Sequence, residues 1–294
     1  MEASILIVSK NRKQALKKTL LLLKPMLDLS KHEALVFLDG CTDGSNSLIE
    51  TIPWVKWFFV NESIGASKAR HQLYKKAIGT YFIGFDDDAH PLNADFIDSV
   101  KKVFVKNHNV GIIAFEEIKG VFDSDEIAIK SGSSNSIEYL TNEFIGCGFA
   151  IKKDVYEKTN GFPVWMNIYG EESCLSIEVL DKGYDIIYSN QIKVNHRVDI
   201  IERKKRGLNY FRFGKQLKNT TYYYLVYYPF PLIKILKLYW HNFNKYALHD
   251  IKCFVIFFKV IFEVFVKTPQ VLKYRNPVEK DSLKKKKNLS PIKY

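Results

Sequence analysis

Apolar runs and helical patterns alternate along the first part of the chain. Each apolar run is short and ends in a polar turn, which predicts a strand, while the intervening segments space their apolar residues like amphipathic helices. Strands are expected near residues 4–9, 33–39, 54–60 and 80–85, and helices near 11–28, 44–51 and 65–78. Strands separated by helices of this length indicate βαβ units, and therefore a parallel sheet flanked by helices.

The alternation of strands and helices continues less regularly to about residue 200. We expect a helix near 93–106 and a strand near 110–116, followed by a loop region rich in Ser, Gly, Asp and Asn near 119–142. A second strand is expected near 149–151 and a second helix near 153–159. Asn93 would cap the first of these helices, and Gly161 would end the second.

Beyond residue 200 both the pattern and the charge change. Residues 201–294 hold 21 of the 44 Lys and Arg but only 5 of the 32 Asp and Glu, so they carry +16 within a whole-chain charge of +12. They also hold 20 of the 42 aromatic residues. Residues 250–267 predict an amphipathic helix, which is too polar to span a bilayer because a spanning helix needs about 20 apolar residues. The end, including Lys284–Lys287, is expected to be disordered.

Length and composition indicate two parts. With 294 residues and 47% hydrophobic residues, the chain can build one large domain with an appended segment, and we divide it into 1–200 and 201–294. The four cysteines are scattered without a CxxC pair, which indicates reduced thiols and argues against a disulfide framework or a zinc site. An apolar strand begins at Ile5, so no signal peptide is expected. The basic, aromatic-rich segment suggests an anionic partner surface, either membrane or nucleic acid.

Three consecutive aspartates, Asp86, Asp87 and Asp88, follow the apolar run of residues 81–85. Like charges at the end of a buried strand repel one another, and a divalent cation is the usual compensator because Mg²⁺ and Mn²⁺ prefer oxygen ligands. In an open α/β sheet the carboxyl ends of the strands are also where ligands bind. The alternative is a solvated turn before the next helix.

Other motifs accompany the triplet in a distinctive order. They are Ser4–Arg12, Leu38–Ser45, Ile64–Arg70, Asp86–Pro91, Gly146–Ala150, Gly161–Pro163, Tyr169–Glu172 and Val194–His196. In order and spacing, residues 3–200 resemble the family 2 glycosyltransferases with a GT-A fold. The remainder, with Tyr and Arg clusters before amphipathic helices, resembles the bacterial members that build cell-surface polysaccharides. The resemblance implies the α/β GT-A fold with a helical, basic C-terminal extension, a nucleotide-sugar donor, Mn²⁺ or Mg²⁺, and inversion at the anomeric carbon.

The resemblance also implies a metal site in this chain. Asp86 and Asp88 correspond to the family's DxD motif, and Asp88 is the expected metal ligand. Asp86 would contact the ribose or sugar, or the metal, and His196 would complete the metal and diphosphate site. The alternative for His196 is a structural histidine at the end of a strand.

Further residues are implied on the donor side. Asp39 would accept a hydrogen bond from a ring N–H of uracil, thymine or guanine, or would merely shape its glycine-containing turn. Arg70 would hold a phosphate or a base carbonyl, or would be a surface arginine. Ser9 and Asp87 are expected beside the donor. The family often has a base-packing aromatic residue where this chain has Lys10, which could contact the diphosphate instead.

The segment Tyr169–Glu172 lies where the family carries its catalytic base, a carboxylate that takes the proton of the attacking hydroxyl. The second residue of its acidic pair is usually Asp, and Glu172 is one methylene longer. We expect Glu172 to be the base and Glu171 to anchor the acceptor or support the loop. The alternative is that both cap a helix. Trp165 and Gly148 are expected on the acceptor side, where Trp165 would stack on a sugar face; the alternative for Trp165 is a core residue.

The expected function is a metal-dependent, inverting hexosyltransferase. It would move a sugar from a UDP-, GDP- or dTDP-sugar to a glycan or lipid-linked acceptor in cell-surface polysaccharide synthesis. Residues 201–294 would dock on an anionic membrane, so the expected location is cytoplasmic, at the inner face of the membrane. Their apolar faces could instead pack on the catalytic domain or on a second subunit.

Three alternatives remain. A nucleotidyltransferase usually opens with a glycine-rich phosphate loop, whereas residues 9–12 contain no glycine. A nucleic-acid-binding protein is disfavoured by the acidic first 200 residues, so no specific nucleic-acid partner is expected. A non-catalytic relative is disfavoured because both acidic motifs are present.

Overall fold

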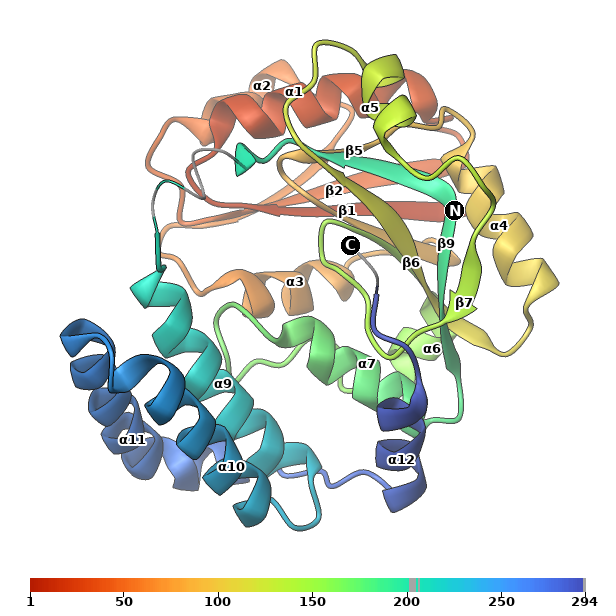
Figure 1. Cartoon of the computed structure of the whole chain (residues 1–294). Helices are drawn as coiled ribbons and strands as arrows, with labels where there is room; N and C mark the ends of the chain where they lie inside the picture. The colour runs from red at the N-terminus through yellow and green to blue at the C-terminus, as the bar shows by residue number, and fades with distance from the viewer. Residues whose placement is uncertain (201–204, 206, 293–294) are drawn as a thin grey trace.

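A nine-stranded sheet forms the framework of the first 200 residues, in a computed structural model that describes residues 1–200, 205 and 207–292 (Figure 1). The strand order is β3-β2-β1-β4-β8-β6-β9-β5, and β7 also pairs with β9. The strands are β1 (Ala3–Ser9), β2 (His32–Asp39), β3 (Lys56–Val60), β4 (Tyr81–Asp86), β5 (Ala89–Pro91), β6 (Val110–Lys119), β7 (Glu138–Leu140), β8 (Gly148–Lys152) and β9 (Asp185–His196). Strands β1 to β4 pair in parallel, as the βαβ pattern predicted, whereas β8 runs antiparallel between β4 and β6.

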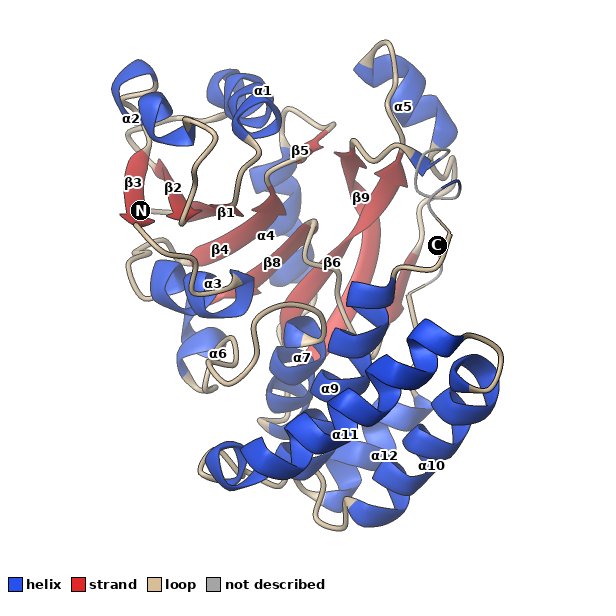
Figure 2. Cartoon of the chain, turned by 90° about the vertical axis from the view of Figure 1, so that its left-hand side faces the viewer, coloured by secondary structure: helices blue, strands red, loops and turns tan. Residues whose placement is uncertain are grey.

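Helices cover both faces of the sheet (Figures 1 and 2). Alternation along the strands determines this arrangement, because Ile5 and Ile7 of β1 contribute to one apolar core and Leu6 contributes to the other. The first core is closed by α1 (Lys13–Leu23), α2 (Leu48–Thr51) and α4 (Phe96–Lys106). The second is closed by α3 (Ala66–Tyr74), α6 (Lys153–Glu157) and α7 (Glu171–Asp181).

A helical extension packs against the outer side of α7 (Figure 2). Its described elements are α9 (Tyr210–Tyr227), α10 (Leu232–Asn242), the π-helical turn η3 (Phe243–Ala247), α11 (Ile251–Leu272) and α12 (Lys280–Asn288). Leu175 and Val179 of α7 face the sheet, while Cys174 and Ile177 pack into the core of the extension. Helix α7 is therefore held from both sides. Among the described helices, none has the length and apolar character needed to cross a bilayer.

Two expectations for the middle of the chain were wrong. Residues 119–142, expected to be a loop region, contain the helix α5 (Asp125–Ser131) and the strand β7. Asn93 is not a helix cap, because α4 begins at Phe96 and Oδ1 of Asn93 instead accepts a hydrogen bond from the backbone N–H of Lys193. Strand β7 and Asn93 were misjudged because both pair with β9, which lies far away in the sequence.

The lysine run near the end was expected to be disordered but forms part of α12. Lys285 pairs with Asp185 at 2.7 Å, and Lys286 pairs with Glu143 at 3.1 Å. Beyond α12 the chain returns to the sheet, where Ser290 forms a parallel bridge with Thr141. Residues 293–294 lie outside the described residues.

Candidate active site

The three aspartates lie at the carboxyl end of β4 and in the turn that leads to β5. Asp86 ends β4 and remains partly exposed, whereas Asp87 and Asp88 are only 5% and 3% exposed. This burial contradicts the alternative of a solvated turn. Two buried carboxylates side by side need neutralising partners.

Ser9, at the end of β1, and Arg12, in the loop after it, contact these carboxylates, and Arg12 supplies a positive charge. Arg12 Nη2 donates to Asp88 Oδ2 over 2.6 Å, and its Nε lies 3.3 Å from Asp87 Oδ1. Ser9 Oγ donates to Asp87 Oδ2 over 2.7 Å. Burial still outweighs these contacts for Asp87 and raises its pKa to about 7. Arg12 was not among the predicted site residues, although it ends the first motif.

His196, at the end of β9, places its two ring nitrogens between two carboxylates. Its Nδ1 lies 2.5 Å from Glu117 Oε1, and its Nε2 lies 3.2 Å from Asp88 Oδ1. Burial opposes a charge on the ring, but these carboxylates outweigh it and raise the pKa of His196 to about 9. Burial likewise opposes ionisation of Asp88, yet His196 and Arg12 lower the pKa of Asp88 to about 2. Without a metal ion, these shifts favour a protonated His196 beside an ionised Asp88, whereas an imidazole that binds a metal is neutral.

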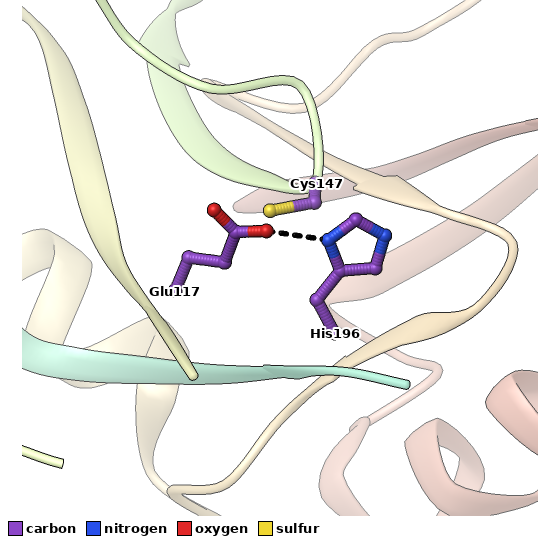
Figure 3. A group of neighbouring side chains, drawn as sticks. All are labelled: Glu117, Cys147 and His196. Carbon is purple, nitrogen blue, oxygen red and sulfur yellow. Dashed lines mark hydrogen bonds and ion pairs between the residues drawn. The ribbon is translucent and has the colours of Figure 1, made fainter. Parts of the chain in front are cut away.

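Glu117 was missed by the sequence analysis. Figure 3 shows its carboxylate facing the His196 ring, with the thiol of Cys147 beside it. Lys119 also lies 3.4 Å from the second oxygen of Glu117. The only sequence signal was a carboxylate near the carboxyl end of a predicted strand, which is too common to single out a residue.

The donor set of Asp86, Asp88 and His196 fits a divalent ion. One ligand atom from each lies within 4.8 Å of the others, and Asp88 Oδ1 is buried without a well-aligned hydrogen bond from any described residue. Carboxylate oxygens with one imidazole suit Mn²⁺ or Mg²⁺. Glu117, Cys147 and His196 form a second group with similar spacing, but one of its ligands is a thiol, which Mn²⁺ and Mg²⁺ do not favour.

Arg70 of α3 joins three carboxylates from distant segments. Its Nη2 donates to Asp86 Oδ1 over 2.7 Å, and its Nη1 lies 3.0 Å from Glu171 Oε1 and 3.4 Å from Glu172 Oε1. The structure thus brings the predicted base segment to the predicted metal site. Burial, and next the charge of Glu171, raise the pKa of Glu172 to about 8. Arg70 is buried among these groups, so it is not a free surface arginine.

Gly146 allows this close packing. A Cβ at that position would lie 2.6 Å from Glu172 Oε1 and 2.9 Å from Arg70 Nη2. Any side chain there would push apart the contact between Arg70 and the acidic pair.

The loop before α7 has an unusual backbone. Tyr169 and Gly170 have φ angles of 71° and 105°, in the left-handed region that is uncommon for a bulky residue such as Tyr169. Asn219 of α9 holds this loop, because its Nδ2 donates to the carbonyl oxygens of Ile168 and Tyr169 over 2.7 and 2.9 Å. Glu171 and Glu172 then occupy the first turn of α7. The extension therefore positions the entry to the acidic pair, a contact that the sequence did not reveal.

The other donor-side residues lie at the ends of β1 and β2. Asp39 is buried, and it accepts hydrogen bonds from Ser63 Oγ, Ile64 N and Gly65 N over 2.7, 2.7 and 3.1 Å. It therefore shapes the loop that leads into α3. Lys10, next to the buried Ser9, is exposed.

The two residues expected on the acceptor side are both packed against protein. Gly148 is buried in β8, where a Cβ would lie 2.8 Å from the Val194 side chain. Trp165 is half-buried, with its ring 6.4 Å from that of Tyr222 and 6.3 Å from that of Tyr227. Trp165 thus lies where the sheet-containing part and the extension meet.

Solved structures share this fold at low sequence identity. A mannosyltransferase from Pyrobaculum calidifontis, in complex with GDP-Man and Mn²⁺, has a TM-score of 0.57 and 17% identity, covering 97% of this chain and 83% of that one. GalNAc-T7, with UDP, GalNAc and Mn²⁺, has a TM-score of 0.58 and 16% identity, covering 80% and 49%. Staphylococcus aureus TarS 1–349 has a TM-score of 0.53 and 14% identity, covering 67% of this chain, which spans 60% of TarS 1–349.

The sequence comparisons give the family. No curated protein matches the chain. The model of Glycosyl transferase family 2 matches residues 4–159, which include β1, the loop held by Asp39 and the acidic triplet. The chain therefore belongs to glycosyl transferase family 2, as the order of its motifs indicated, and it has the GT-A fold.

Proposed function

We propose that this glycosyltransferase is a metal-dependent, inverting hexosyltransferase. It would take a sugar from a UDP-, GDP- or dTDP-sugar and transfer it to a hydroxyl of a glycan or lipid-linked acceptor in cell-surface polysaccharide synthesis. The observation that carries the proposal is the contact of Arg70 with both Asp86 and the acidic pair. It joins a candidate metal and diphosphate site to a candidate proton acceptor.

Asp86, Asp88 and His196 would hold Mn²⁺ or Mg²⁺. When bound, the ion would stabilise the charge that develops on the departing nucleoside diphosphate. Ser9, Lys10, Asp39, Arg70 and Asp87 would complete the donor site. For Asp39 the structure supports an indirect role, in which it holds the loop of residues 63–65 beside the donor. Exposed Lys10 remains free to reach an anionic diphosphate.

Glu172 would accept the proton of the attacking hydroxyl. Its raised pKa makes it a stronger base than an ordinary carboxylate, which suits proton transfer near neutral pH. Glu171, buried and paired with Arg70, would hold the cluster together. Attack on the side of the sugar opposite the leaving group is a single displacement, so the anomeric configuration would invert.

The acceptor would approach past α7 and the extension. Trp165 would offer a ring near the acceptor, and Gly148 would keep the underlying strand close to β9. We propose residues 1–200 as the catalytic domain and residues 201–294 as a basic extension that brings the enzyme to an anionic membrane surface. A location on the cytoplasmic side of the membrane would supply both nucleotide sugars and lipid-linked acceptors.

Thermal shift and donor hydrolysis, measured with a panel of UDP-, GDP- and dTDP-sugars with and without Mn²⁺, test this function. We expect one nucleotide class to stabilise the protein in a manganese-dependent way. Asp88→Asn should abolish that shift, whereas Asp154→Asn, an exposed carboxylate on α6, should not. NMR of the product would then report the anomeric configuration.

Other outcomes would favour the alternatives. Stabilisation by nucleoside triphosphates with release of pyrophosphate would indicate a nucleotidyltransferase. The absence of any response to donors, with or without metal, would indicate a non-catalytic relative.

A further inference from the structure

Helix α11 is apolar on two opposite faces. One face packs into the extension through Cys253, Phe257, Val260 and Val264. The opposite face presents large apolar side chains to solvent: Ile251 (76% exposed), Val255 (60%), Phe258 (48%), Phe262 (70%) and Phe265 (79%). At 100° per residue these five fall on a single stripe along the helix. A helix with apolar side chains on two opposite faces normally has a partner on each of them.

A second exposed apolar group lies on α10 and the turn before it. Its members are Phe230, Leu232, Ile233, Leu236 and Trp240, each between 64% and 75% exposed. The turn η3 connects α10 to α11, and the ring of Phe243 in η3 lies 6.4 Å from those of both Phe254 and Phe258. Both helices lie on the outside of the extension (Figure 2). Exposed apolar surface concentrated in this way marks an interaction site.

Lysines border both apolar groups. Lys234 and Lys237 lie on α10, and Lys252 and Lys259 lie beside the stripe on α11; all four are exposed. Within the described part of the chain, none of them has a carboxylate at ion-pair distance, although Lys234 and Lys252 lie over the rings of Tyr228 and Tyr210. Their stems can lie along apolar surface while their ammonium groups reach outward to anionic groups.

The apolar stripe and the lysines beside it together indicate which kind of partner would bind this surface. A second copy of the chain would bring two segments of net charge +16 together, which repulsion opposes. An anionic bilayer surface complements both features, because its phosphates attract lysines and its acyl boundary accepts Phe, Trp and Leu side chains. The charges that interrupt α11 suit a helix that lies in the plane of the interface.

We propose that the exposed faces of α10 and α11 form a docking surface for a bilayer of anionic phospholipids. This inference rests on the proposed function and identifies the residues of the extension that would contact the membrane. Its test measures binding rather than turnover, so failure of the docking surface and failure of the transferase activity can be told apart.

Co-sedimentation of the full chain with vesicles tests the proposal. We expect the protein to pellet with phosphatidylcholine vesicles that contain phosphatidylglycerol, to pellet poorly with phosphatidylcholine alone, and to lose part of its binding as salt rises. The double variant Phe262→Glu/Phe265→Glu should weaken binding at least about tenfold. Phe59→Glu is the matched control, because Phe59 is 56% exposed on β3, outside the extension.

A charge series tests the lysine border separately. Lys252→Glu/Lys259→Glu should weaken binding to the anionic vesicles and flatten its salt dependence, whereas Lys75→Glu/Lys76→Glu, exposed lysines after α3, should change it little. Thermal melts confirm that each variant is folded.

Wild-type protein that stays in the supernatant with both vesicle types would overturn the proposal. Binding unchanged by the phenylalanine variant would do the same. A concentration-dependent dimer that this variant abolishes, without vesicle binding by the wild type, would assign the surface to a second copy instead.

Discussion

Arg12 donates from Nη2 to Oδ2 of Asp88 over 2.6 Å, so a cation of the protein already occupies an oxygen of the proposed metal ligand. The Arg12 side chain is 46% exposed, whereas that of Asp88 is only 4% exposed. The arginine can therefore move away while the aspartate stays in place. The arginine and a bound divalent ion would therefore compete for the same carboxylate.

Replacing Arg12 by alanine should therefore tighten Mn²⁺ binding. For a half-exposed ion pair worth about 1 kcal/mol the gain is about fivefold. Without metal the variant should melt at a lower temperature, because Asp87 and Asp88 lose a counter-charge. Manganese titration by electron paramagnetic resonance and melting curves check both effects, with Lys17→Ala, an exposed cation on α1, as the control. Weaker manganese binding in Arg12→Ala would show that Arg12 supports the ion instead.

Transfer activity should depend on the ionisation of Glu172. The pKa of this carboxyl is raised to about 8, so it is protonated below that pH and cannot accept the acceptor's proton. We expect kcat/KM to fall as pH drops below about 8. Glu172→Gln should reduce transfer by about 10²- to 10⁴-fold while leaving Mn²⁺ binding unchanged. Wild-type turnover by Glu172→Gln would move the base elsewhere.

Glu117 should set the orientation of the His196 ring. Because Nδ1 faces Glu117, Nε2 is directed toward Asp88. A carboxylate that holds the other nitrogen of a metal-binding histidine typically contributes at least about tenfold to metal affinity. Glu117→Ala should weaken Mn²⁺ binding by roughly that factor. Glu117→Gln, which keeps an acceptor oxygen, should lose less.

Nitrogen-15 NMR of the His196 ring adds a second readout for Glu117, since removal of the Glu117 carboxylate should change the protonation of Nδ1. Glu157→Ala is the control, because it removes an exposed carboxylate of α6 away from the His196 ring. Unchanged manganese binding in Glu117→Ala would contradict the orienting role.

Asn219 should link the extension to turnover. Its side chain supplies hydrogen bonds to two carbonyls of the loop before Glu171, where the backbone is left-handed. Asn219→Ala should cost about 1–3 kcal/mol of unfolding free energy and lower kcat, while manganese binding stays the same. Asn244→Ala removes a similar bond to a carbonyl at an exposed position and is the control. Equal effects of the two variants on kcat would contradict this link.

The sequence predicted the parts of the molecule that depend on local order. The strands from β1 to β4 follow from the alternation of apolar runs and helical segments. The approach of Asp86, Asp88 and His196 was anticipated through the motif order, because parallel strands bring their carboxyl ends to one edge of the sheet. The acidic pair of α7 was found in the same way.

Contacts between segments far apart in the sequence escaped prediction. Arg12 meets Asp88 across 76 positions, and Glu117 meets His196 across 79. Neither residue stands out by its type or its spacing. The lysine run of α12 resembles a disordered tail by composition, but the folded chain supplies Asp185 and Glu143 as its partners. These features become visible only once the sheet and extension are assembled.

The bridge between Thr141 and Ser290 has a practical consequence for protein engineering. Thr141 Oγ1 and the backbone N–H of Asn142 both donate to the carbonyl oxygen of Ser290, over 2.9 and 3.2 Å. Shortening the chain at residue 200 would therefore strip the segment after β7 of its neighbour and expose Cys174 and Ile177 of α7 to water. A more soluble variant for crystallisation or assay is therefore better made by replacing the exposed phenylalanines of α11 than by deleting the extension.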